Sequence, residues 1–346
     1  MSDRTSGSHL DPGPILELGF GFMASKTLLS AVQLGVFTEL AKAPRTRDDL
    51  GAAVGIHPRG AIDLFDALVS LDLLEKEGDG EKARYRNTPL ADRFLDRAKS
   101  SYVGGILEMF EARLYGFWGD LTEGLRTGRP QNEIKHTGAP MFETLYGDPE
   151  RLEGFMNAMQ GVSLPNFEVL AERFDFSPYQ TLCDVGGANA VLSRTVAARH
   201  PHLRCTSWDL PVVEPIARRA ISEAGLGERV TAASGNFFTD PLPKADVVTM
   251  GMILHDWNLE HKRMLIGKVF AALPAGGAFI AIENLIDDAR RENTLGLLMS
   301  LNMLIEFGDA FDYTGADFDG WCREAGFSRT EVLPLRGPVS AAVAWK

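Results

Sequence analysis

The sequence is poor in cysteine, and its few cysteines show no pairing. Cys183, Cys205 and Cys322 are an odd set without the close spacing of a zinc site or a disulfide framework. We therefore expect reduced cysteines with structural roles. A disulfide-stapled scaffold and a cysteine-bound metal are both disfavoured.

Positive charge is also scarce. The chain carries 35 Lys and Arg against 47 Asp and Glu, a formal net charge of -12, and has no run rich in Lys or Arg. Affinity for nucleic acids comes largely from Lys and Arg that neutralise phosphates, so no nucleic-acid partner is expected.

Membrane and export signals are a third absence. We expect no apolar run long enough to cross a bilayer, and hence no membrane partner. Residues 1–14 are polar and lack the basic start and apolar stretch of a secretory signal. These features predict a disordered N-terminus over residues 1–14 and a cytoplasmic protein.

The length of 346 residues exceeds one ordinary core and indicates two domains. We expect a helical domain over residues 15–100, a helical connecting and substrate-lining segment over 101–172, and an α/β domain over 173–346. The inter-domain junction is expected near residues 174–179.

The first domain has the order of a winged helix. A helix capped by Thr46 is followed by a helix over residues 58–73 and by a hairpin over 74–86 with Gly-Asp-Gly at its centre. In winged-helix DNA readers the second helix faces the phosphates, but here it carries Asp63 and Asp66. We therefore expect a dimerisation platform and a homodimer.

From Thr181 onward, short apolar runs alternate with helical stretches. This pattern predicts a doubly wound, mostly parallel α/β sheet with helices on both faces. Strands are expected near residues 181–185, 203–208, 229–234, 245–250 and 277–284, with a closing pair near 328–334 and 339–345.

A glycine turn follows the first of these strands. Asp184-Val185-Gly186-Gly187 leads into a helix, and Asp209 ends the next strand, 25 residues past Asp184. Glycines allow a ligand to approach the backbone, and an acid at that distance can accept from ribose hydroxyls. Ala190 stands in place of a third glycine, which favours a nucleoside cofactor without a diphosphate.

Two further residues end neighbouring strands and suit proton transfer. His255 follows the strand that ends near Met250, and Glu283 ends the next one. A histidine is suited to act as a base near neutral pH, and a carboxylate can hold its tautomer. We expect His255 to be a catalytic base oriented by Glu283.

The ordered motifs Asp184-Val185-Gly186-Gly187, Asp209-Leu210-Pro211, Gly235-Asn236-Phe237-Phe238 and His255-Asp256-Trp257 resemble those of one family. It is the S-adenosylmethionine-dependent small-molecule O-methyltransferases of plant and bacterial type, including acetylserotonin O-methyltransferase-like members. The resemblance covers about residues 15–346. It implies a Rossmann-like class I methyltransferase domain with a seven-stranded sheet, preceded by a winged-helix dimerisation domain.

The resemblance also implies roles for individual residues. His255 is the base, Glu283 and Asp312 orient it, and Asp256 contacts the substrate. Cofactor contacts are expected at Asp184, Gly186, Gly187, Asp209, Leu210, Asn236, Phe237 and Trp257. Aromatic and methionine side chains suit an apolar acceptor, and we expect pocket walls from Phe110, Tyr115, Trp118, Met159, Met299, Met303 and Phe307.

The sequence departs from the family at the cofactor turn and nearby. Ala188 and Ala190 replace glycines, Asn236 replaces an aspartate, and Gly251 replaces a lysine of plant members. We expect the methyl group of Ala190 to narrow the turn. The carbonyl of Asn236 is still expected to accept from the adenine amino group.

These features predict O-methylation of a small aromatic or polyketide-like metabolite. C- or N-methylation, for example of an α-keto acid, remains an alternative. A metal-dependent version needs a second ligand near His255, but residues 301–314 contain no histidine, so no metal is expected. A catalytically dead winged-helix regulator is disfavoured because the chain retains both His255 and Glu283.

Overall fold

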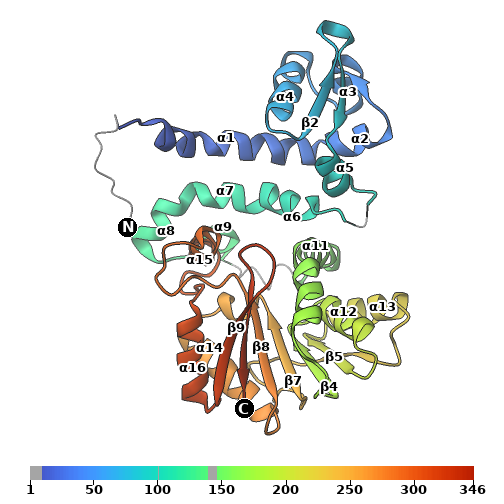
Figure 1. Ribbon diagram of the computed structural model, residues 1–346. Helices are drawn as coiled ribbons and strands as arrows, with labels where there is room; N and C mark the ends of the chain where they lie inside the picture. The colour runs from blue at the N-terminus through green and yellow to red at the C-terminus, as the bar shows by residue number, and fades with distance from the viewer. Residues whose placement is uncertain (1–9, 100, 139–145) are drawn as a thin grey trace. The chain divides into compact units, whose positions relative to one another are not determined.

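The computed structural model describes residues 10–99, 101–138 and 146–346, and the chain folds as two compact units, Met1–Ala112 and Arg113–Lys346 (Figure 1). Most of the predicted disordered N-terminus lies outside the described residues, and the first helix begins at Gly13. The predicted division at residues 100 and 172 stays a prediction. In the structure, the helices between Tyr115 and Arg173 belong to the second unit.

The first unit is a winged helix with a long N-terminal helix. Its elements are α1 (Gly13–Gln33), α2 (Val36–Lys42), β1 (Arg45–Thr46), α3 (Arg47–Ala53), α4 (Pro58–Ser70), β2 (Leu74–Glu77), β3 (Arg84–Asn87), α5 (Pro89–Leu95) and α6 (Gly104–Met109). The strands form an antiparallel sheet in the order β1-β3-β2. The predicted succession of capped helix, second helix and hairpin is confirmed.

Local chemistry explains these elements. The hydroxyl of Thr46 accepts from the N–H of Asp49 at 3.3 Å and so caps α3. The acids of α4 point to partners within the unit: Asp63 pairs with Arg59, and Asp66 accepts from the Tyr85 hydroxyl at 2.7 Å. The helix therefore offers no row of free cations to a phosphate backbone.

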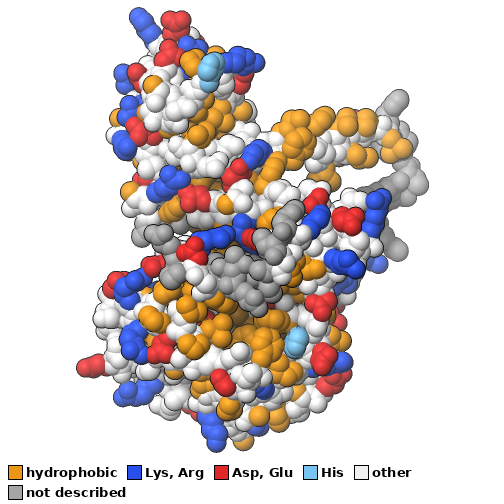
Figure 2. Space-filling model, turned by 180° about the vertical axis from the view of Figure 1, so that it is seen from behind, with side chains coloured by type: hydrophobic (Ala, Val, Ile, Leu, Met, Phe, Trp, Pro, Cys, Tyr) orange, Lys and Arg blue, Asp and Glu red, His pale blue; other side chains and the backbone are white. Residues whose placement is uncertain are grey.

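Helix α1 corrects one expectation from the sequence. It is a 21-residue helix that is long and apolar enough to cross a membrane by length and composition, although we expected no such run. Hydrophobic side chains lie exposed along its first half, as the orange projection at the upper right of Figure 2 shows: Ile15, Leu16, Leu18, Phe20, Phe22 and Met23. Glycine, serine and the charged residues Glu17 and Lys26 are interspersed, which masked the apolar character in the sequence.

The second unit is a seven-stranded sheet covered by helices. Its strands run in the order β6-β5-β4-β7-β8-β10-β9, and β10 runs opposite to the other six. They are β4 (Thr181–Val185), β5 (Arg204–Asp209), β6 (Val230–Ser234), β7 (Val247–Gly251), β8 (Ala278–Glu283), β9 (Arg329–Pro334) and β10 (Ser340–Trp345). All seven predicted strands are confirmed.

Helices pack on both faces of this sheet, as predicted (Figure 1). One face carries α11 (Pro149–Arg173), α12 (Val191–Arg199) and α13 (Glu214–Glu223), and the other carries α14 (Leu259–Ala272) and α16 (Gly315–Ala325). Shorter helices precede α11, namely α7 (Tyr115–Phe117), α8 (Leu121–Thr127) and α9 (Glu133–Thr137), and α15 (Thr294–Phe307) packs on α8. The three cysteines are free and buried in this unit.

Candidate active site

The carboxyl ends of four adjacent parallel strands define the site. The chain order reverses at β4, with β5 on one side and β7 on the other, and ligands of doubly wound folds bind at such a point. The glycine turn follows β4, Asp209 ends β5, His255 follows β7, and Glu283 ends β8. Residues far apart in the sequence therefore meet at one edge.

Two positions of the glycine turn after β4 have no room for a side chain. Gly186 has a φ of +74°, and a β-carbon there would lie 2.4 Å from Ile253 Cδ1. A β-carbon on Gly187 would lie 2.3 Å from Ser207 Oγ and 3.0 Å from the carbonyl of Asp184. The backbone is therefore bare where a ligand would approach.

Two alanines continue this turn in the left-handed region. Ala188 has a φ of 46° and Ala190 a φ of 62°, a conformation that costs an L-residue about 1–2 kcal/mol. Ala190 is fully buried and packs in the hydrophobic core below the turn. The expectation that its methyl group narrows the cofactor turn is therefore wrong.

The two acids at the turn are held by the backbone and by a neighbouring strand. Asp209 accepts from the N–H of Ala188 at 2.9 Å and of Leu210 at 2.7 Å, and burial raises its pKa. Asp184 accepts from the Thr249 hydroxyl at 2.7 Å, and burial raises the pKa of Asp184 to about 7. The Asp209 carboxylate is thus fixed before any ligand arrives.

The Asn236 loop forms the next part of this edge. Asn236 Oδ1 accepts from the N–H of Phe238 at 2.9 Å. This is the oxygen predicted to accept from the adenine amino group, and one of its lone pairs is already engaged. Lys268 was not singled out from the sequence, yet its Nζ donates to the carbonyls of Phe237 at 2.6 Å and Asp240 at 3.0 Å. The rings of Phe237 and Phe238 meet Trp257 edge-on.

Tyr146 is a second residue that no motif signalled. Tyr146, Ala188 and Leu210 all pack against one small hydrophobic cluster. Burial raises the pKa of the Tyr146 hydroxyl, and the charges of Asp209 and Asp256 add to this rise. Tyr146 therefore belongs to the packing around the glycine turn.

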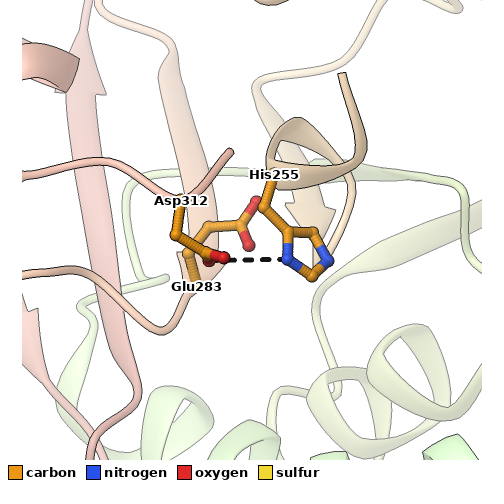
Figure 3. A group of neighbouring side chains, drawn as sticks. All are labelled: His255, Glu283 and Asp312. Carbon is orange, nitrogen blue, oxygen red and sulfur yellow. Dashed lines mark ion pairs between the residues drawn. The ribbon is translucent and has the colours of Figure 1, made fainter. Parts of the chain in front are cut away.

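The histidine cluster contains three side chains from separate segments (Figure 3). His255 lies on a short 3-10 turn, Leu254–Asp256, Glu283 ends β8, and Asp312 precedes α16. Their ligating atoms all lie within 4.8 Å of one another, and all three side chains are buried. The sequence motifs and the fold thus converge on one group.

Of the two expected orienting acids, Asp312 and Glu283, only Asp312 forms an ion pair with the imidazole. His255 Nδ1 lies 3.4 Å from Asp312 Oδ1, the pair drawn as a dashed line in Figure 3. Glu283 Oε1 instead accepts from the backbone N–H of Leu254 at 3.0 Å. Asp256 approaches the other ring nitrogen, with its Oδ1 3.3 Å from His255 Nε2.

This crowding of carboxylates changes the proton affinity of the cluster. Burial opposes a charged imidazole, but Asp256, Glu283 and Asp312 outweigh it and raise the pKa of His255 to about 10. Burial raises the pKa of Asp256 to about 6 and that of Glu283 to about 7. The imidazole therefore holds its proton firmly until the pH is alkaline.

Part of the expected acceptor wall gathers near this cluster. Helix α15 packs against the His255 turn and carries Met299, Met303 and Phe307, of which Met303 is buried. Trp118 Nε1 donates to Asn302 Oδ1 of α15 at 2.9 Å. Met159 lies on α11 beside Gln160, which accepts from Asn189 Nδ2 of the glycine turn at 2.7 Å, and the assignment of Met159 to the wall stays a prediction.

The other two expected wall residues are less closely tied to the cluster. Tyr115 begins α7 in the same unit, whereas Phe110 belongs to the first unit. Both assignments to the acceptor wall stay predictions.

A glycine turn after β4, an acid ending β5 and a buried histidine after β7, on a sheet of this order, define a methyltransferase of the S-adenosylmethionine-dependent class. The family model of the O-methyltransferase domain matches residues 118–328, and that of the O-methyltransferase dimerisation domain matches residues 16–97. The chain therefore belongs to the O-methyltransferase family.

Known relatives agree with this assignment. The chain is 42% identical to the tetracenomycin polyketide synthesis 8-O-methyl transferase TcmO of Streptomyces glaucescens over 97% of each chain. It is 37% identical to the N,N-dimethyltransferase OxyT of Streptomyces rimosus over 90% of each. The crystal structure of human N-acetylserotonin methyltransferase with S-adenosylmethionine matches with a TM-score of 0.90 at 30% identity, covering 99% of both chains.

These findings confirm the predicted family, fold class and enzyme class. The protein is an S-adenosylmethionine-dependent methyltransferase. The residues at the glycine turn fit that cofactor, since Gly186 has the positive φ of a tight turn and the buried Asp209 carboxylate is pre-oriented. Asp209 would hold the ribose, and Phe237 and Trp257 would border the adenine.

Proposed function

We propose that the protein methylates a hydroxyl of a small aromatic or polyketide-like metabolite, with His255 as general base and Asp312 and Glu283 holding it in place. The contact between His255 Nδ1 and Asp312 Oδ1, buried at the carboxyl edge of the sheet, carries this proposal. A base there stands beside the glycine turn that fits the cofactor.

The geometry suggests how the proton moves. When bound, S-adenosylmethionine supplies a methyl group on a sulfonium, a good leaving group. Asp312 holds Nδ1, so in the neutral ring the lone pair lies on Nε2, which takes the proton from the acceptor hydroxyl. A phenol has a pKa of about 10, and the carboxylates that raise the pKa of His255 make the neutral ring a stronger base toward it.

Asp256 has a distinct place in this scheme. Its carboxylate lies 3.3 Å from Nε2, the same nitrogen that must meet the acceptor. An arriving hydroxyl would donate its one hydrogen to Nε2, and Asp256 would lie beside it. We therefore assign Asp256 to alignment of the acceptor.

We infer the class of acceptor from the side chains of the expected acceptor wall and from the names of the related enzymes. Trp118, Met303 and Phe307 offer flat and flexible apolar contacts that suit an aromatic ring. The relative TcmO is named for polyketide synthesis, which favours a polyketide-like phenol. An amine is the second candidate, because OxyT is named an N,N-dimethyltransferase.

One experiment separates these acceptors. The purified protein is incubated with S-adenosylmethionine and a panel of phenols, quinols, amines and keto acids, and mass gains of one methyl group are read. Methylation of phenols is expected. A product only from amines would favour N-methylation, and a product only from keto acids would favour C-methylation.

We also propose that the protein is a homodimer. The family match over residues 16–97 is a dimerisation domain, and the exposed apolar side chains of α1 need cover. Light scattering on the full chain is expected to give twice the mass of 37.8 kDa. The cytoplasmic location remains a prediction.

A further inference from the structure

Lys262 is a buried lysine that the mechanism above does not use. It lies in the first turn of α14, and its relative exposure is 0%. Lysine is almost never fully buried unless it has partners. Its surroundings therefore call for an explanation.

The ammonium group of Lys262 joins two segments of the active site. Its Nζ donates to the carbonyl of Trp257, which directly follows the His255 turn. It also lies 3.8 Å from the centre of the Phe311 ring and 5.8 Å from that of Tyr313. Phe311 and Tyr313 flank Asp312, so one side chain contacts both segments that bring His255 and Asp312 together.

Several carboxylates face this ammonium group from a distance. Glu283 lies on β8, Asp312 and Asp309 precede α16, and Asp256 lies on the His255 turn. Among the residues that the structure describes, no carboxylate forms a direct ion pair with Lys262. Burial lowers the pKa of Lys262 to about 8, although those carboxylates oppose the shift.

The buried carboxylates around His255 need the positive charge of Lys262. Asp256, Glu283 and Asp312 surround one imidazole, whereas Glu306 of α15, near Asp256, is already paired with Arg113 at 3.1 Å. Buried charges are costly unless opposite charges balance them. His255 alone can supply only one positive charge.

We propose that Lys262 is a positioning residue for His255, which ties the His255 turn to the Asp312 segment and balances the carboxylates that surround the imidazole. This inference rests on the proposed role of His255 as base. Below about pH 8 the cationic side chain repels the imidazolium, so it makes loss of the ring proton easier in that range. Without it, less of the ring would be neutral below pH 8.

The test uses two neutral variants of the full chain. Lys262→Gln keeps a hydrogen-bond donor without the charge, and Lys262→Met keeps the length of the side chain without either. Lys262→Arg restores the charge. Lys346→Met is the matched control, because Lys346 also donates to carbonyls of the α14 region, at 2.7 Å and 2.8 Å, and lies 4.4 Å from the Phe270 ring.

Two readouts are compared across these variants. The first is the pH dependence of the His255 ring signals, followed by NMR of histidine-labelled protein with S-adenosylhomocysteine and assigned with His255→Ala. The second is the pH profile of kcat/KM with a phenol that the acceptor panel identifies. In the wild type a step in the ring signals is expected near pH 8, where Lys262 loses its proton, and this step should vanish in both neutral variants. Their kcat/KM below pH 8 is expected to fall about tenfold.

The controls separate this effect from simple destabilisation. Lys346→Met is expected to lower Tm and leave both readouts unchanged, and Lys262→Arg to restore kcat/KM below pH 8 toward the wild-type value. A neutral variant that loses stability but keeps the step near pH 8 and the wild-type kcat/KM would overturn the proposal. If His255→Ala retained turnover, the proposed base would fail, while the NMR step would still decide the effect of Lys262.

Discussion

The imidazole Nδ1 of His255 lies 3.4 Å from Asp312 Oδ1, while Glu283 accepts from the backbone of the neighbouring Leu254. The two acids therefore act on the histidine in different ways. Asp312 faces the ring itself, and Glu283 fixes the turn that carries it. This difference in contact leads to different expectations for their variants.

Asp312→Asn should be the more damaging of the two. Loss of this carboxylate removes the group that holds Nδ1, and we expect kcat to fall by about a hundredfold or more. Glu283→Gln retains an oxygen for the N–H of Leu254, and we expect a loss of about tenfold. Single-turnover rates at saturating cofactor measure both.

Asp309→Asn is the matched control for these variants. Asp309 lies in the same segment but accepts from Asn258 at 2.9 Å rather than from the imidazole. Its turnover is expected to stay near that of the wild type. Equal rates for Asp312→Asn and Asp309→Asn would show that the Nδ1 contact has no catalytic role.

The carboxylates around His255 should determine how kcat/KM depends on pH. They raise the pKa of His255 to about 10, so the neutral ring becomes more abundant as the pH rises, and kcat/KM should climb from neutral pH toward that value. Asp312→Asn removes one carboxylate charge, which lowers the pKa of the imidazole. The rise of kcat/KM should therefore occur at lower pH in this variant, even though its maximal rate is smaller. A rise at higher pH than in the wild type would contradict this expectation.

The two left-handed alanines predict different responses to glycine. Ala188→Gly relieves a positive φ at a partly exposed site, and we expect a gain of about 0.5–1 kcal/mol after the entropic cost of glycine. Ala190→Gly relieves a similar strain but removes a buried methyl group worth about 0.8 kcal/mol, so it should be nearly neutral. Denaturant unfolding measures both, and Ala197→Gly, buried within α12, is expected to destabilise.

Metal chelation should leave turnover unchanged. His255, Glu283 and Asp312 have the residue types of a metal site, but a metal requires a neutral imidazole, and the carboxylates favour the protonated ring. Turnover is measured after treatment with a chelator and after each divalent ion is restored. Loss of activity that a divalent ion restores would show that the cluster is a metal centre.

The strands and the order of Asp209, His255 and Glu283 could be predicted because apolar periodicity and strand ends are local features of the sequence. The closer approach of Asp312 could not, since it depends on how the segment before α16 meets the His255 turn. Lys262 gave no signal because a lysine in an amphipathic helix normally faces solvent. The methyl group of Ala190 was misplaced because its left-handed φ directs the side chain into the core.

The most direct test of the account is His255→Ala, with titration calorimetry of S-adenosylmethionine and turnover measured on the same sample. His202→Ala is the control, since His202 lies at the opposite end of β5 and contacts the carbonyl of Phe176 at 3.2 Å. The account predicts cofactor affinity close to that of the wild type and a loss of turnover of about a hundredfold or more. Turnover in His255→Ala equal to that of the wild type would contradict the assignment of the base.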